Sequence, residues 1–97
     1  MMAGKRGHVR EDEHEVIEAV RDVLRDVLGI DGPRAAGFTD ATPLFGALPE
    51  LDSMAVAGVL TELEDRLGIV IDDDDIDGET LETFGSLTRF ATAKALG

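Results

Sequence analysis

Apolar residues recur at helical spacing in three separate stretches of this chain, and none of these stretches has the alternation typical of a half-buried strand. A helix with one apolar face is stable when that face packs against other helices. The sequence therefore predicts an all-α fold, a small bundle of three main helices and one short acidic helix near residues 72–79. The apolar positions of the first stretch are Val16, Ile17, Val20, Val23, Leu24, Val27 and Leu28.

Start and stop signals set the expected limits of the three main helices. The first is expected over residues 11–28, with acidic residues at its start and Gly29 at its end. The second is expected over residues 53–67. Ser86 is expected to cap the third, over residues 87–96. The core-facing positions of the last two are Val56, Val59, Leu60, Leu63 and Leu67, then Leu87, Phe90, Ala91 and Leu96.

A long connection, residues 30–51, separates the first two helices. It contains Gly and Pro at several positions and exceeds an ordinary turn between helices in a bundle. Its apolar residues predict a loop that packs on the helices: Phe38, Leu44, Phe45 and Leu48.

The charge of the chain is strongly acidic, with a formal net value of −12. Such a surface argues against nucleic-acid binding, which requires basic residues facing the phosphates, and favours basic protein partners. The first ten residues differ, because they contain Lys5, Arg6 and Arg10 and no acidic residue. We expect residues 1–10 to form a disordered basic tail and residues 11–97 to form the domain.

Three absences in the sequence limit its chemistry and its location. No apolar run approaches the roughly 20 residues of a membrane span, and the N-terminus lacks the apolar stretch of a signal peptide. We therefore expect a cytoplasmic protein, and we also expect it to be a monomer. The chain has no cysteine, so it forms no disulfide and no thiolate metal site, and a thioester would need a thiol from a prosthetic group.

The tripeptide Asp52-Ser53-Met54 lies where the long connection becomes the second helix. Backbone N–H groups at a helix start lack partners, and the helix dipole there favours negative charge. A phosphate ester on Ser53 would be stabilised at such a position. The alternative is that Asp52 or Ser53 is only the N-cap, a role common to both residue types.

The acidic run from Asp72 to Glu79 offers a different chemistry. From Asp73 to Gly78 it matches the opening of a calcium-binding EF-hand loop. That loop requires a bidentate Glu at its twelfth position, where this chain has Phe84. We expect a solvated acidic segment without a specific metal site, and keep calcium binding through Asp73–Asp77 as an alternative.

Residues Leu51-Asp52-Ser53-Met54, followed by an apolar-striped acidic helix that ends in Leu67-Gly68-Ile69, resemble the acyl carrier proteins. The resemblance extends from about residue 11 to residue 96. It implies that Ser53 carries a covalent 4′-phosphopantetheine arm, whose thiol holds acyl groups as thioesters, and that the acidic neighbour Asp52 assists the transferase and its magnesium ion. It also implies a carrier in lipid or polyketide biosynthesis rather than an enzyme. The chain accordingly has no G-x-S-x-G elbow.

The resemblance further implies partners and the surface that they contact. The partners are a phosphopantetheinyl transferase and the acyl-loading and acyl-using enzymes, which dock through basic surfaces. The expected contact residues are Met54, Ala57, Glu62 and Asp65. The run from Leu44 to Met54 is most similar to stand-alone bacterial carriers associated with exosortase and exopolysaccharide gene clusters.

Two positions depart from the family pattern. Glu50 stands where a Gly is common, and Gly58 stands where an acidic residue is frequent. The first departure affects the loop before Ser53, and the second removes one expected partner contact. An acidic helical interaction module without a prosthetic group remains the other hypothesis.

Overall fold

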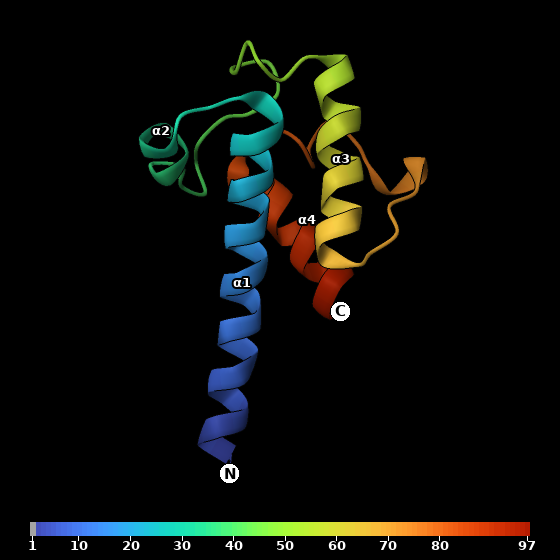
Figure 1. Cartoon of the computed structure of the whole chain (residues 1–97). Coiled ribbons are helices and arrows are strands. Elements are labelled where there is room, and N and C mark those ends of the chain that lie inside the picture. Colours follow the sequence, from blue (N-terminus) through green and yellow to red (C-terminus); the bar gives the residue numbers. More distant parts are fainter. Residues whose placement is uncertain (1) are drawn as a thin grey trace.

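The structure is a computed structural model that describes the backbone of residues 2–97 and the side chains of residues 12–97. Its helices are α1 (Met2–Leu28), α2 (Gly32–Ala36), α3 (Ser53–Leu67), the 3₁₀ helix η1 (Asp73–Asp75) and α4 (Phe84–Leu96). In Figure 1, α3 and α4 lie beside the C-terminal half of α1, and α2 projects from the loop that follows α1. The predicted all-α bundle with a long loop before α3 is confirmed.

The limits of the helices agree with the prediction in part. α3 spans residues 53–67 as expected, because Asp52 caps its start and Gly68, in the left-handed conformation with φ 64°, ends it. α1 begins at Met2 instead of residue 11. Residue 1 and the side chains of residues 2–11 lie outside the described part of the chain, so the disordered tail and the domain boundary stay predictions.

The start of α4 differs from the prediction, because Thr83 and not Ser86 is its N-cap. The Ser86 N–H donates to Thr83 Oγ1 at 3.0 Å, and the Thr83 N–H donates to Ser86 Oγ at 3.0 Å. This reciprocal capping places Phe84 inside the helix, where it is 2% exposed. At the other end, Leu96 is 44% exposed, so its expected place in the core was wrong.

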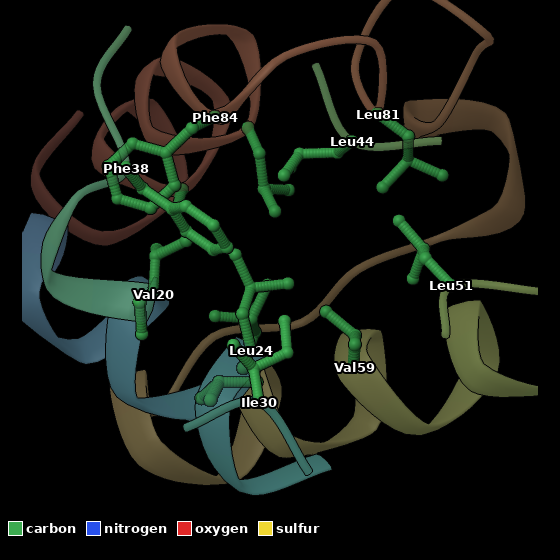
Figure 2. Packing of buried hydrophobic residues seen from close by; sticks show 14 of the residues in the cluster. Val20, Leu24, Ile30, Phe38, Leu44, Leu51, Val59, Leu81 and Phe84 are labelled. Atoms are coloured by element: carbon green, nitrogen blue, oxygen red, sulfur yellow. The ribbon is translucent and has the colours of Figure 1, made fainter. Parts of the chain in front are cut away.

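The core contains side chains from the main helices and from the loop between α1 and α3 (Figure 2). Phe38 of the loop packs on Phe84 of α4, with ring centroids 5.7 Å apart. Leu44 and Leu51 of the same loop are also buried, so the prediction of a packed loop is confirmed, except at Phe45, which is 50% exposed. The loop that leads to Ser53 is therefore part of the core.

Backbone hydrogen bonds also join this loop to the start of α4. The Leu44 N–H donates to the Glu82 carbonyl at 2.8 Å, and the Phe84 N–H donates to the Thr42 carbonyl at 2.8 Å. At Gly85 the approach leaves no room for a side chain, because an added Cβ would lie 2.7 Å from the Asp40 carbonyl oxygen. These contacts fix the loop well before it reaches α3.

α2 is a short helix within the long connection that the apolar pattern did not predict. Asp31 caps it by accepting the Arg34 N–H at 3.2 Å, and Pro33 lies in its first turn. From α1, the Arg21 guanidinium donates to the Ala35 carbonyl at 2.7 Å. α2 is thereby fixed to the body of the bundle.

Candidate functional site

Ser53 is the first residue of α3, and Asp52 before it is the N-cap with an extended backbone. The Asp52 carboxylate accepts the Ala55 N–H at 2.8 Å, and its carbonyl accepts the Val56 N–H at 2.9 Å. The Ser53 side chain is exposed and has no hydrogen bond within the described part of the chain. The two roles weighed from the sequence therefore fall on different residues, since Asp52 is the cap and the Ser53 hydroxyl is free.

This geometry fits a phosphate ester on Ser53. The first N–H groups of a helix have no intrahelical acceptor, and the aligned peptide dipoles place partial positive charge at this end. α3 has 15 residues, so its dipole is well developed. A phosphodiester on the exposed hydroxyl would lie where its negative charge is stabilised and where an enzyme can reach it.

A groove of about 390 Å³ begins at Ser53 and extends along α3. Val56 and Leu60 of α3 form one wall, and Ile71 and Ile76, on either side of η1, form the other. The Glu64 carboxylate accepts the Ile71 N–H at 2.8 Å and so ties the far wall to α3. Sequence analysis did not predict this groove, and its one local signal was the pair of isoleucines on either side of residues 72–75.

The expected contact residues on α3 do not form one uniform surface. Met54 is 85% exposed, and Ala57 is exposed beside the groove. Glu62 is half-buried and accepts a hydrogen bond from Arg66 at 3.0 Å, whereas Asp65 is exposed and forms no ion pair with the described residues. Only one of the two expected acidic contacts is thus a free carboxylate.

Arg66 also connects α3 to α1. Its guanidinium donates to Asp26 at 3.0 Å as well as to Glu62. The hydrogen bond from Arg66, followed by that from Arg25, lowers the pKa of Asp26 below its ordinary value of 3.8. Glu62 thus belongs to an interhelical network, which limits its availability to a partner.

Two carboxylates of the acidic run, those of Asp75 and Asp77, bind groups of the protein itself. Lys94 of α4 contacts Asp75 at 2.6 Å, and this hydrogen bond is the main reason that the pKa of Asp75 is lowered. Asp77 accepts the Thr80 N–H at 2.9 Å, which is the largest cause of its own lowered pKa. Among the described residues, no three His, Asp or Glu side chains are grouped to hold a metal ion. The calcium hypothesis therefore gains no support from this geometry.

The two departures from the family pattern both have structural explanations. The Glu50 carboxylate accepts hydrogen bonds from Arg34 at 2.7 and 3.4 Å, which lower its pKa. Gly58 faces α1, and a Cβ added there would lie 3.3 Å from Val27 Cγ1. The missing side chain at position 58 thus permits the close packing of α1 on α3.

A family model described as "Phosphopantetheine attachment site" matches residues 18–91. The chain is also similar to a solution NMR structure of a holo acyl carrier protein from Nitrosomonas europaea. The two share 47% sequence identity with a TM-score of 0.73, over 79% of this chain and 92% of that chain. This chain belongs to the acyl carrier protein family. No curated protein matches it.

Membership of the acyl carrier protein family confirms two predictions from the sequence. The fold is the small helical bundle of these proteins, and the prosthetic group is a covalently attached phosphopantetheine. Acyl carrier proteins transport groups between enzymes and do not themselves catalyse reactions. In the part of this carrier that the structure describes, no helix has the length and apolar character needed to cross a membrane.

Proposed function

We propose that this protein carries acyl groups as thioesters on a 4′-phosphopantetheine arm attached to Ser53 and presents them to partner enzymes. The main support is the free hydroxyl of Ser53 at the start of α3, inside the region that matches the attachment-site family. The cofactor supplies the thiol, which a chain without cysteine lacks.

The comparison with Ser86 supports the assignment of Ser53. These are the two serines of the chain. The Ser86 hydroxyl is half-buried and donates to the Thr80 carbonyl at 2.9 Å while it accepts the Thr83 N–H. The Ser86 hydroxyl is therefore hydrogen-bonded within the cap of α4. The Ser53 hydroxyl, by contrast, can form a phosphodiester bond with loss of its proton.

The residues around Ser53 have distinct tasks in this function. Asp52 holds the first turn of α3 and presents an exposed carboxylate beside the hydroxyl, in the place where the family uses an acidic residue to assist the transferase. Met54 and Ala57 offer apolar contacts next to the attachment point. Asp65 offers a free negative charge to basic partners, and Glu62 contributes to the field of the same helix.

Incubation with a broad-specificity phosphopantetheinyl transferase and coenzyme A tests this function. Intact-mass spectrometry should show one added phosphopantetheine on the wild type and none on Ser53→Ala. Because Asp52 and not Ser53 is the cap, Ser53→Ala should keep its thermal midpoint within about 2 °C of the wild type. Ser86→Ala is the matched control and should be modified while folded.

An unmodified wild type, or a modified Ser53→Ala, would refute the assignment. The first result would favour the acidic interaction module without a prosthetic group. Acyl loading is then measured on the modified protein as a second mass increase that hydroxylamine removes, which is the behaviour of a thioester.

A further inference from the structure

The segment that leads to Ser53 is joined to α2 by an ion pair between Arg34 and Glu50. Arg34 Nη1 lies 2.7 Å from Glu50 Oε2, and Arg34 Nη2 lies 3.4 Å from Glu50 Oε1. This two-pronged arrangement uses both oxygens of the carboxylate and fixes orientation as well as distance. It joins residues that are 16 positions apart in the sequence.

α2 is itself held on the bundle by Arg21. The Arg21 side chain is 18% exposed, donates to the Ala35 and Phe38 carbonyls at 2.7 and 3.1 Å, and lies 4.9 Å from the ring centroid of Phe84. A continuous series of contacts therefore runs from the core through α2 to Glu50. Ser53 follows Glu50 by three positions.

The fold does not require the carboxylate of Glu50. Leu51 is 3% exposed and anchors the chain in the core, and Asp52 caps α3 independently. The Glu50 carboxylate is bound by Arg34 and takes no part in the cap of α3. The evident effect of this ion pair is on the relative placement of α2 and the segment before Ser53.

We propose that Arg34 and Glu50 are positioning residues for phosphopantetheine attachment. They hold α2 beside the segment 49–52, so that the transferase meets one preformed surface made of α2, this segment and the start of α3. The inference rests on the proposed function, because it concerns the same serine. Without the pair, the transferase must order these parts when it binds, which weakens binding and leaves the chemical step unchanged.

Steady-state kinetics of modification test the proposal with Glu50→Gln, Arg34→Gln and the charge-swapped double variant Arg34→Glu/Glu50→Arg. Each single variant should raise the KM for the carrier about threefold, the effect expected of an exposed ion pair, with kcat unchanged. The double variant should restore the KM. Asp22→Asn is the control, because it removes an ion pair of similar exposure within α1, with Arg25 at 3.2 Å, and should leave the KM unchanged.

Hydrogen exchange gives a readout that needs no transferase. The Leu51 N–H donates to the Leu48 carbonyl at 3.0 Å in the segment beside Glu50. Its exchange should be about threefold faster in Glu50→Gln than in the wild type and unchanged in Asp22→Asn.

The experiments distinguish a failure of the proposed function from a failure of the positioning role. A wild type that is not modified refutes the proposed function and the positioning role together. If the wild type is modified, an unchanged KM or unchanged Leu51 exchange in the single variants overturns the positioning role alone. The positioning role is also overturned if the single variants raise the KM and the charge-swapped double variant does not return it to the wild-type value. The transferase would then recognise the individual side chains.

Discussion

Replacement of Arg21 by Met should destabilise the protein strongly, although Arg21 is outside the site. The guanidinium donates to the Ala35 and Phe38 carbonyls at 2.7 and 3.1 Å and lies 4.9 Å from the Phe84 ring centroid. Met keeps an apolar stem of similar length, so the variant removes the charge and the donors with little loss of packing.

The magnitude follows from these contacts. A hydrogen bond to a charged group contributes about 1.5–3 kcal/mol, and a partly desolvated cation–π contact contributes about 1 kcal/mol. These contributions share one side chain and do not add, so we expect a net loss of about 2–3 kcal/mol. For a domain of this size, that corresponds to a decrease in thermal midpoint of about 10 °C or more.

Urea unfolding followed by far-ultraviolet circular dichroism measures this loss. Arg25→Met is the matched control, because Arg25 is 42% exposed and, among the residues whose side chains the structure describes, pairs with the neighbouring carboxylates Asp22 and Asp26 of α1. That control should lose about 0.5 kcal/mol or less. If Arg21→Met and Arg25→Met unfold at the same urea concentration with equal slopes, the anchoring of α2 by Arg21 does not contribute to stability as argued.

Three further predictions concern pH, helix packing and partner docking. The hydrogen bond from Lys94 lowers the folded-state pKa of Asp75, so its stabilising effect is present above the ordinary value of 3.8 and is lost as the pH falls through the lower folded value. The difference in thermal midpoint between wild type and Lys94→Met should therefore shrink as the pH falls below 3.8. A difference that stays constant as the pH falls would contradict a stabilising contact between Lys94 and Asp75. Gly58→Ala should gain less than the roughly 1 kcal/mol of helix propensity, because its Cβ meets Val27, and should gain the full amount in a Val27→Ala background. A full gain in the wild-type background would show that α1 leaves room at Gly58. Asp65→Lys should slow modification at low salt with unchanged stability, and added salt should reduce the difference, whereas equal low-salt rates would remove Asp65 from the docking surface.

Local sequence patterns determined the helical class and placed Ser53 at the start of a helix. Apolar spacing predicts an amphipathic helix wherever it occurs, because the relevant side chains are neighbours on one helix face. The limits of α3 were also predictable, since the Asp52 cap and the Gly68 stop act within a few residues of the helix ends. The same local signals left open whether Asp52 or Ser53 is the cap, and the structure assigns the cap to Asp52.

The start of α4 shows where local signals become ambiguous. Thr83 and Ser86 can both cap a helix, and here they form one reciprocal cap. The choice between them depends on Phe84, which enters the core against Phe38 and donates its N–H to the Thr42 carbonyl. Those partners come from a loop more than 40 positions earlier in the sequence, so no window around the helix contains the information.

Only the tertiary structure decided which charged residues around the site are free. Glu62 and Asp65 have similar sequence contexts, yet Arg66 binds Glu62 and extends to Asp26 of α1, whereas Asp65 forms no ion pair with the described residues. The groove beside Ser53 likewise exists because Ile71 and Ile76 lie opposite α3. Whether a segment is helical follows from contacts within a few residues. Which charges form ion pairs, which stay unpaired and where a groove opens depend on which segments the folded chain places side by side.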